Sequence, residues 1–424
     1  MTWELPDDER LWMVKILVAL GTMWCLWIAR RVWTAPRVCP RAPIAGCFSA
    51  KLPENALFQL LLIFLTAILV CSKLALPTAG LVCLALTLSC FDWTRYRPWL
   101  HQNLTILTVI AAFQDSQASE GLNICRLTSV SIYFWAGVLK MNASFFHRVL
   151  PFFLAPMLLK IPLVAYQRWF RFWGQQLAED PESQSRQVTE KIRKYAFIVP
   201  LVEASIGVGL LFPLTCSIAM VLAIAMHCFI LLWVAAVGPK KCPTIGPWNI
   251  GMLLTTATLF WGADSHGCWD ILLGSHCGTH LMVLFVFMLL PALGLFNLLD
   301  PVLSHGHWSG RHVYGFLGLS QRTYRILPKT IQEHCKPTGP SSYYLDLGEW
   351  FVFEGGVPPV QQERLLVTVA QDFQRYATRP DDVSLTVLRM PSTCSTQQET
   401  KLYTGQVLFD LSAQTAGKTV RAQS

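Results

Sequence analysis

Three ionisable side chains lie deep inside long apolar stretches of the sequence. Arg126, Glu203 and His227 each stand four or more residues from the end of such a stretch. Ionisable groups are costly in the core of a bilayer, so each is a candidate functional residue. A carboxylate and an imidazole can both exchange protons, and a low dielectric constant changes how readily they do so. The pattern indicates either a proton or quinone site, or a buried ion pair that only fixes the register of the helices.

Neighbouring residues extend this candidate site. A stripe at helical spacing consists of Arg126, Val130, Tyr133, Gly137 and Lys140. Glu203 is followed one turn later by Gly207, which would let a second helix approach closely. We expect Arg126 and Glu203 to pair inside the bundle, with His227 and Tyr133 hydrogen-bonded nearby. The catalytic candidates are Arg126, Tyr133, Lys140, Glu203, His227 and Asn249, and whether the chain is an enzyme stays open.

A second group of polar residues follows a later apolar stretch, between Asp264 and His280. Its potential metal ligands are His266, Cys268, His276, Cys277 and His280. Their spacing fits no regular zinc pattern, so they are weak metal candidates. A disulfide between Cys268 and Cys277 is the favoured interpretation if this loop faces an oxidising compartment.

Other residues carry less information about chemistry. Most remaining cysteines lie in apolar stretches, where cysteine behaves as a small apolar residue, and the chain has no CxxC pair. His305, His307 and His312 open the C-terminal region, and we expect a solvated linker there rather than a metal site. The sequence contains no phosphate-binding glycine loop, nucleophile elbow or HExxH motif.

The elements that must position these residues are predicted from composition and hydropathy. Of the 424 residues, 53% are hydrophobic and only 14% charged, against about 25% charged in a soluble domain. This excludes an ordinary soluble enzyme, and a spanning helix needs roughly 20 apolar residues. We predict an all-α transmembrane bundle of about nine spans: Leu11–Ala29, Ala56–Ser72, Leu74–Phe91, Asn103–Phe113, Leu122–Leu139, Ala196–Phe212, Thr215–Val237, Trp248–Ala263 and Thr279–Leu298. Val149–Tyr166 contains three prolines and a lysine, which favours a broken, interfacial or re-entrant segment over a span.

The distribution of Lys and Arg predicts the orientation. Placing the N-terminus outside puts nearly all basic loops, and the C-terminal region, inside. The net charge of +8 is then a topology signal with attraction to anionic lipid, and no nucleic-acid partner is indicated. We divide the chain into three parts. Residues 1–55 hold the first span and a basic loop, residues 56–300 form the bundle, and residues 304–424 form a small α+β cytoplasmic domain. The bundle includes a charged inner loop at 167–194, in which Arg168–Trp173 suggests an interfacial helix.

Several short blocks occur together in an order that resembles a known superfamily. They are Phe91–Trp99, Arg126 with Tyr133–Asn142, Glu203 with Gly207, His227, and Gly246–Asn249. Over roughly residues 55–300 the chain is similar to HTTM-type and DoxX-like membrane proteins, and distantly to the membrane domain of vitamin K-dependent carboxylases. The resemblance implies a multi-pass protein of the bacterial cytoplasmic membrane that serves redox or protein-maturation chemistry. It also implies a quinone or related isoprenoid lipid as cofactor, and membrane lipid and a separate thiol-disulfide oxidoreductase or electron-transfer protein as partners.

Two other functions stay open at this point. The buried charges could move a proton or a small solute, as in a transporter or channel, although no inverted repeat is visible. Alternatively, the bundle could anchor a scaffold that acts through its cytoplasmic region.

Overall fold

The structure is a computed structural model. It describes residues 5–37, 40–44, 52–71, 73–113, 117–160, 197–238, 243–262, 267–274, 278–306, 308–310, 313–355, 362–390 and 399–404. Predictions that fall on residues 167–194, including Arg168–Trp173, or on His266, His276 and Cys277, lie outside the described residues.

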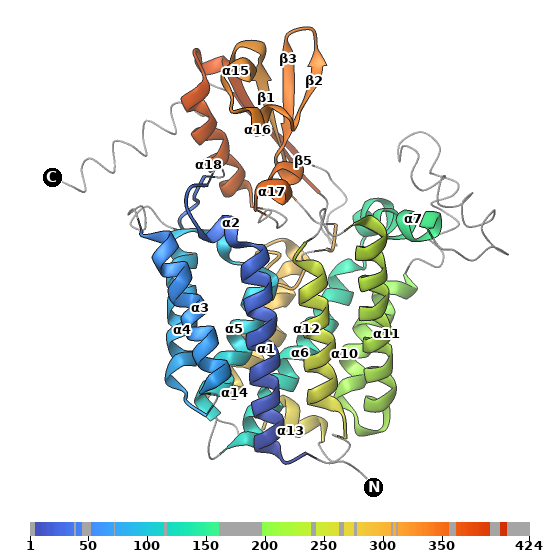
Figure 1. Ribbon diagram of the computed structural model, residues 1–424. Coiled ribbons are helices and arrows are strands. Elements are labelled where there is room, and N and C mark those ends of the chain that lie inside the picture. Colours follow the sequence, from blue (N-terminus) through green and yellow to red (C-terminus); the bar gives the residue numbers. More distant parts are fainter. Residues whose placement is uncertain are drawn as a thin grey trace.

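The described helices up to Phe296 form a helical bundle (Figure 1). Its helices are α1 (Asp7–Ile28), α2 (Arg30–Trp33), α3 (Glu54–Val70), α4 (Leu76–Phe91), a 3-10 turn η2 (Trp93–Arg95), α5 (Pro98–Phe113), α6 (Ala118–Lys140), α7 (Leu150–Lys160) after the π-helical η3 (Phe145–Val149), α10 (Ile198–Leu211), α11 (Pro213–Val237), α12 (Ile245–Phe260), α13 (Cys268–Leu272) and α14 (Gly278–Val283), which continues as η4 (Leu284–Leu289) and η5 (Leu290–Phe296). A helix therefore overlaps each of the nine predicted stretches.

Four of these helices are long and apolar enough to cross a membrane: Asp7–Ile28, Ala118–Lys140, Pro213–Val237 and Gly278–Phe296. The other five that overlap predicted spans, α3, α4, α5, α10 and α12, have 14 to 17 residues. Such helices rise about 21–26 Å, less than the hydrocarbon core of about 30 Å. The structure thus supports a membrane protein with four candidate spans, and the count of nine and the orientation stay predictions.

The centre of the bundle is α6, most of whose residues are buried. It packs against α10 through a glycine on each helix. A Cβ built on Gly137 would lie 2.3 Å from the Ala204 nitrogen, and one on Gly207 would lie 2.7 Å from the Phe134 nitrogen. Only glycine lets the two backbones come this close, so the predicted role of Gly207 is confirmed.

The Pro-containing segment after α6 is helical over Leu150–Lys160, with Pro156 inside the helix. In Figure 1, α7 lies across one end of the bundle rather than along it. Over its described part the segment is an unbroken helix through Pro156, and its place at the membrane surface stays a prediction.

The C-terminal region contains a five-stranded antiparallel sheet of order β2-β3-β1-β4-β5. Its strands are β1 (Val313–Ser320), β2 (Cys335–Gly339), β3 (Ser342–Asp346), β4 (Val383–Arg389) and β5 (Glu399–Tyr403), and its helices are α15 (Gln321–Ile326), α16 (Lys329–Gln332), α17 (Leu347–Gly355), α18 (Glu363–Phe373), η6 (Gln374–Tyr376) and η7 (Pro380–Asp382). This confirms a small α+β unit, hereafter the cap. The cap stands on the end of the bundle at which α1 ends and α3 begins (Figure 1).

Candidate functional site

A chain of hydrogen bonds crosses the interior of the bundle and joins three helices. The His227 ring on α11 contacts the Tyr133 hydroxyl of α6 at 2.7 Å and the Asn249 Oδ1 of α12 at 2.8 Å. The Tyr133 hydroxyl also lies 2.9 Å from the Thr256 hydroxyl. All four side chains are buried. The expected contact between His227 and Tyr133 is confirmed.

The direction of these hydrogen bonds follows from Asn249. Its Nδ2 donates to the Ile245 carbonyl at 2.8 Å, so its Oδ1 must be the atom that faces His227. An amide oxygen only accepts, so His227 Nδ1 carries the proton and donates. In a neutral ring Nε2 then accepts from the Tyr133 hydroxyl, and Tyr133 in turn accepts from Thr256. The chain is therefore directional, from Thr256 through Tyr133 and His227 to Asn249, and we call it the relay.

Helical periodicity in the sequence explains why the relay residues lie together. Asn249 and Thr256 are seven residues apart on α12, so both side chains lie on one face of the helix, toward His227 and Tyr133. His227 stands in the second half of the 25-residue α11, among apolar side chains. No water is needed to complete the chain, because each member satisfies the next.

The expected pairing of Arg126 with Glu203 is wrong. Glu203 pairs with Lys140, whose Nζ lies 2.7 Å and 2.5 Å from the two carboxylate oxygens. Arg126 and Lys140 are 14 residues apart on α6, or about 21 Å along the helix. The Gly137 and Gly207 contacts place the start of α10 beside the end of α6, out of reach of Arg126. The Lys140–Glu203 pair beside this tight contact suits the interpretation as an ion pair that fixes register.

Arg126 lies near the other end of the bundle and is fully buried. Its Nε donates to the Leu259 carbonyl at 2.9 Å, and its Nη1 donates to Asn123 Oδ1 at 2.8 Å. Leu259 belongs to the last turn of α12, whose free carbonyls favour a cation. Arg126 therefore caps a helix and takes no part in the relay.

The weak metal candidates separate in the structure. His280 is fully buried, and its two ring nitrogens lie 2.7 Å from Glu120 Oε1 and 2.9 Å from the Ile271 carbonyl. These contacts occupy both nitrogens, so His280 cannot also bind a metal. Cys268 has a free thiol, and its expected disulfide partner Cys277 lies outside the described residues, so that bridge stays a prediction. Within the described part of the chain, no three His, Cys, Asp or Glu side chains converge as a metal site.

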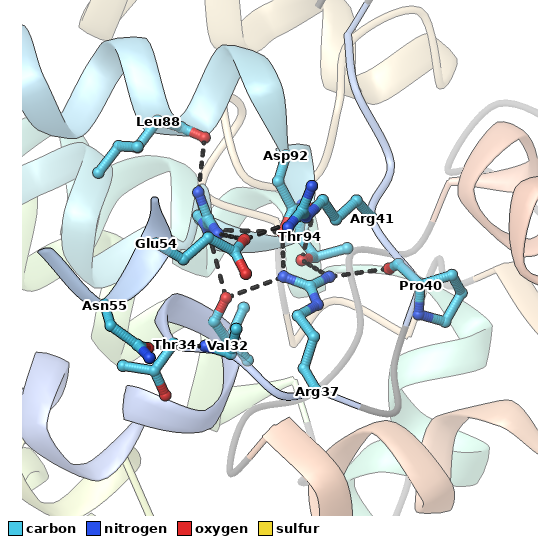
Figure 2. Close-up of polar contacts among 12 residues, drawn as sticks. Val32, Thr34, Arg37, Pro40, Arg41, Glu54, Asn55, Leu88, Asp92 and Thr94 are labelled. Atoms are coloured by element: carbon cyan, nitrogen blue, oxygen red, sulfur yellow. Dashed lines mark hydrogen bonds and ion pairs between the residues drawn. The ribbon is translucent and has the colours of Figure 1, made fainter. Parts of the chain in front are cut away.

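A buried cluster of charges at the cap end was missed by sequence reasoning. Figure 2 shows it: Arg37 pairs with Asp92, and Arg41 with Glu54 at 3.1 Å. Arg95 pairs with Glu54 and lies 3.5 Å from Asp92. Except for Arg41, these side chains are at most 7% exposed. We call these five residues the arginine cluster, and it joins the loop after α2, the start of α3 and the turn after α4.

The acidity of Asp92 reflects this environment. Burial alone would raise the pKa of the Asp92 carboxyl, but the charges of Arg37 and Arg95, a hydrogen bond from Arg37 and the Ala42 backbone N–H lower it below its usual value. Asp92 Oδ1 also accepts from the Thr94 hydroxyl at 2.8 Å. The carboxylate is therefore held ionised, which suits a structural role in linking the loop after α2 to the turn after α4.

The expected solvated linker at His305 is also wrong. His305 is 4% exposed and has a left-handed backbone, with φ of 61°. Its ring lies 5.4 Å from that of Phe287 and 5.9 Å from that of His101. His101 in turn contacts the Tyr96 hydroxyl at 2.5 Å. His307 and His312 lie outside the described residues.

Comparison of the chain with protein-family models, with curated proteins and with solved structures gave no match. The resemblance drawn from the sequence blocks therefore stays a prediction, and function is argued from the site. Of the functional candidates, the structure joins Tyr133, His227 and Asn249 in one network, and separately joins Lys140 with Glu203. Thr256 was missed because a threonine inside an apolar helix gives no distinctive signal.

Proposed function

We propose that the chain is a membrane protein that binds a quinone-like or related isoprenoid lipid and assists membrane-associated redox or protein-maturation chemistry. The observation that supports this most is the relay from Thr256 to Asn249. Within this buried chain the Tyr133 hydroxyl and the His227 imidazole can exchange a proton without admitting water, and Asn249 orients the ring.

The proposed chemistry needs such a proton path. A quinone that accepts two electrons takes up two protons and becomes a quinol. A separate thiol-disulfide oxidoreductase is the proposed partner, because a dithiol that forms a disulfide releases two electrons and two protons. In this scheme the two protons that the dithiol releases equal the two that the quinone takes up. The Tyr133 hydroxyl would donate a proton to the quinone and be reprotonated by one released from the dithiol, while His227 and Thr256 hold that hydroxyl in place by their hydrogen bonds. The cofactor would supply the electron chemistry and the protein the orientation and the protons.

The resemblance and the distribution of basic residues support further parts of the proposal. We propose a multi-pass protein of the bacterial cytoplasmic membrane with about nine spans, an outer N-terminus and an inner C-terminal region. A proton-coupled transporter is the alternative, supported by the same relay, while a scaffold acting through the cap would not need the relay at all.

The test combines lipid extraction with kinetics. Protein purified in detergent should contain a quinone or another isoprenoid, and should accelerate the reduction of an added quinone by a dithiol. Tyr133→Phe and His227→Gln should each lower this rate about 100-fold, which is typical of losing a proton donor. Thr128→Ala is the matched control, since this buried hydroxyl only bonds the Ile124 carbonyl of its own helix.

Two results would overturn the proposal. The first is purified protein without isoprenoid whose His227→Gln variant behaves like the native chain. The second is a proton-coupled flux in proteoliposomes that depends on His227, without any quinone reduction, which would establish the transporter.

A further inference from the structure

A groove of about 720 Å³ runs along the side of the bundle between α1, α3 and α12. Residues of all three helices line it, among them Leu17, Leu20, Trp24, Leu62, Ile250 and Leu254. The lining includes one hydroxyl, that of Thr66, and this hydroxyl donates to the Leu62 carbonyl at 2.9 Å. The groove thus presents an apolar surface of ligand-binding size.

Two glycines keep the groove open where α1 and α12 face each other. A Cβ built on Gly251 would meet no atom within 4 Å, and one built on Gly21 would approach only the Gly251 Cα, at 3.9 Å. Gly137 and Gly207 are required for two helices to pack closely, whereas Gly21 and Gly251 are not. Their missing side chains instead leave space in the groove.

The length of the groove matches one leaflet of a bilayer. On α1 it extends from Leu17 to Trp27, a rise of about 15 Å, which is half of a hydrocarbon core about 30 Å thick. Trp24 and Trp27 lie at one end and are 48% and 55% exposed. Tryptophan is enriched at the level of lipid headgroups, so this end belongs at the membrane surface.

The tryptophan end of the groove is positively charged. The Arg30 side chain donates to the Trp27 carbonyl at 3.1 Å, and its guanidinium lies 5.2 Å from the centre of the Trp27 ring. Arg30 and the following Arg31 are both exposed. Neither forms an ion pair within 4 Å with the described acidic residues, so a cationic surface stands directly beside an apolar channel.

We propose that this groove binds one anionic phospholipid, with an acyl chain along α1, α3 and α12 and its phosphate at Arg30. An acyl chain matches the length and apolar lining, and the phosphate matches the charge at the tryptophan end. This site is separate from the relay and goes beyond the proposed function.

Native mass spectrometry of the full chain tests the site. The protein is transferred from detergent into nanodiscs of phosphatidylglycerol and phosphatidylcholine in equal amounts, and the lipids retained on release are counted. Native protein should retain one phosphatidylglycerol. Gly251→Leu should lower this retention at least tenfold, since the new side chain fills the groove without displacing any atom at its Cβ. Arg30→Gln should weaken the preference for phosphatidylglycerol about fivefold and leave phosphatidylcholine unchanged.

Matched controls separate filling of the groove from general effects. Gly278 also has open space around its Cβ position, so Gly278→Leu should retain lipid as the native chain does. Arg379 is an exposed arginine of the cap, and Arg379→Gln should leave the preference unchanged. Leu254→Trp, at the other end of the groove, gives a second obstruction if Gly251→Leu fails to fold.

Three outcomes would overturn the proposal: no retained phospholipid, equal retention by the native and obstructed variants, or a quinone displaced from the groove by Gly251→Leu. The last outcome would place the isoprenoid of the proposed function here. Loss of phospholipid with unchanged quinone reduction would instead support this site and leave the proposed function to its own test.

Discussion

At the scale of single residues, Asn249 determines what the relay can do. Its amide is oriented by the Ile245 carbonyl and presents an acceptor to His227 Nδ1. That acceptor fixes the ring tautomer, so Nε2 carries no proton and accepts the hydrogen bond that the Tyr133 hydroxyl donates. Asn249 does not exchange a proton itself, but it sets the direction of the hydrogen bonds between Tyr133 and His227, which can exchange one.

Replacing Asn249 by leucine should reverse the tautomer of His227. Without the Oδ1 acceptor, a proton on Nδ1 would be buried without a partner, at a cost of about 1–3 kcal/mol. A proton on Nε2 would avoid this cost by donating to the Tyr133 oxygen. Nitrogen-15 spectra of histidine-labelled protein report the tautomer directly, with Thr128→Ala as the control. An unchanged spectrum for Asn249→Leu would contradict the assigned direction.

At the scale of elements, the contact of α6 with α10 fixes which polar groups can meet. Hydropathy predicted where the helices lie, because membrane helices are long apolar runs. It could not predict which ends face each other, so Glu203 was paired with Arg126 instead of Lys140. In the cap, the sequence predicted a small α+β unit, but β1 gives no clear strand pattern because Gly315 and Gly318 interrupt its apolar alternation.

Gly137→Ala should loosen this contact. The added methyl group would lie 2.3 Å from the Ala204 nitrogen, so the two backbones must separate. We expect a loss of about 1–3 kcal/mol in the free energy of unfolding, as for other overpacked sites. Thermal unfolding in detergent measures it.

Gly246→Ala is the matched control, because a Cβ there would lie 3.8 Å from Val234 in ordinary contact. It should unfold at the native temperature or slightly above, since alanine favours helix more than glycine. Equal stability of the two variants would show that α6 and α10 are not held by the glycine contact.

At the scale of the whole molecule, the arginine cluster and the loops around it join the bundle to the cap. Ala42 donates to Asp92 and also packs within the apolar core of the cap. Arg364 of α18 donates to the Ile44 carbonyl, and Gln362 donates to Asp300. The predicted boundary at residue 304 therefore separates two parts that share side chains. The sequence pattern did not reveal this, because it showed these arginines only as a charge bias between spans.

The arginine cluster should stabilise the fold less at acid pH. The folded pKa of Asp92 lies below the unfolded value of about 3.9. Its contribution to stability is thus complete above that value and is lost as pH falls through the folded pKa. Unfolding temperatures measured in detergent from pH 7 to pH 3 should fall at the acid end.

Arg37→Gln removes one of the charges that lower this pKa, so its profile should be flatter below pH 4. Arg379→Gln, whose arginine lies far from Asp92 in the sequence and is exposed, should keep the native profile. An identical acid slope in all three proteins would show that Asp92 does not govern it.

The strand order of the cap has a consequence for how the chain is made. The central strand β1 begins at Val313, directly after the bundle, but its neighbour β4 begins only at Val383, 70 residues later. A ribosome that adds about 5–20 residues per second needs several seconds to cover that distance. During that interval both edges of β1 are unpaired until β3 (Ser342–Asp346) has been made, and the edge that β4 will cover then stays open. The bundle is therefore complete before the cap can close, and a chain that stops short of Val383 would present an open sheet edge to its neighbours.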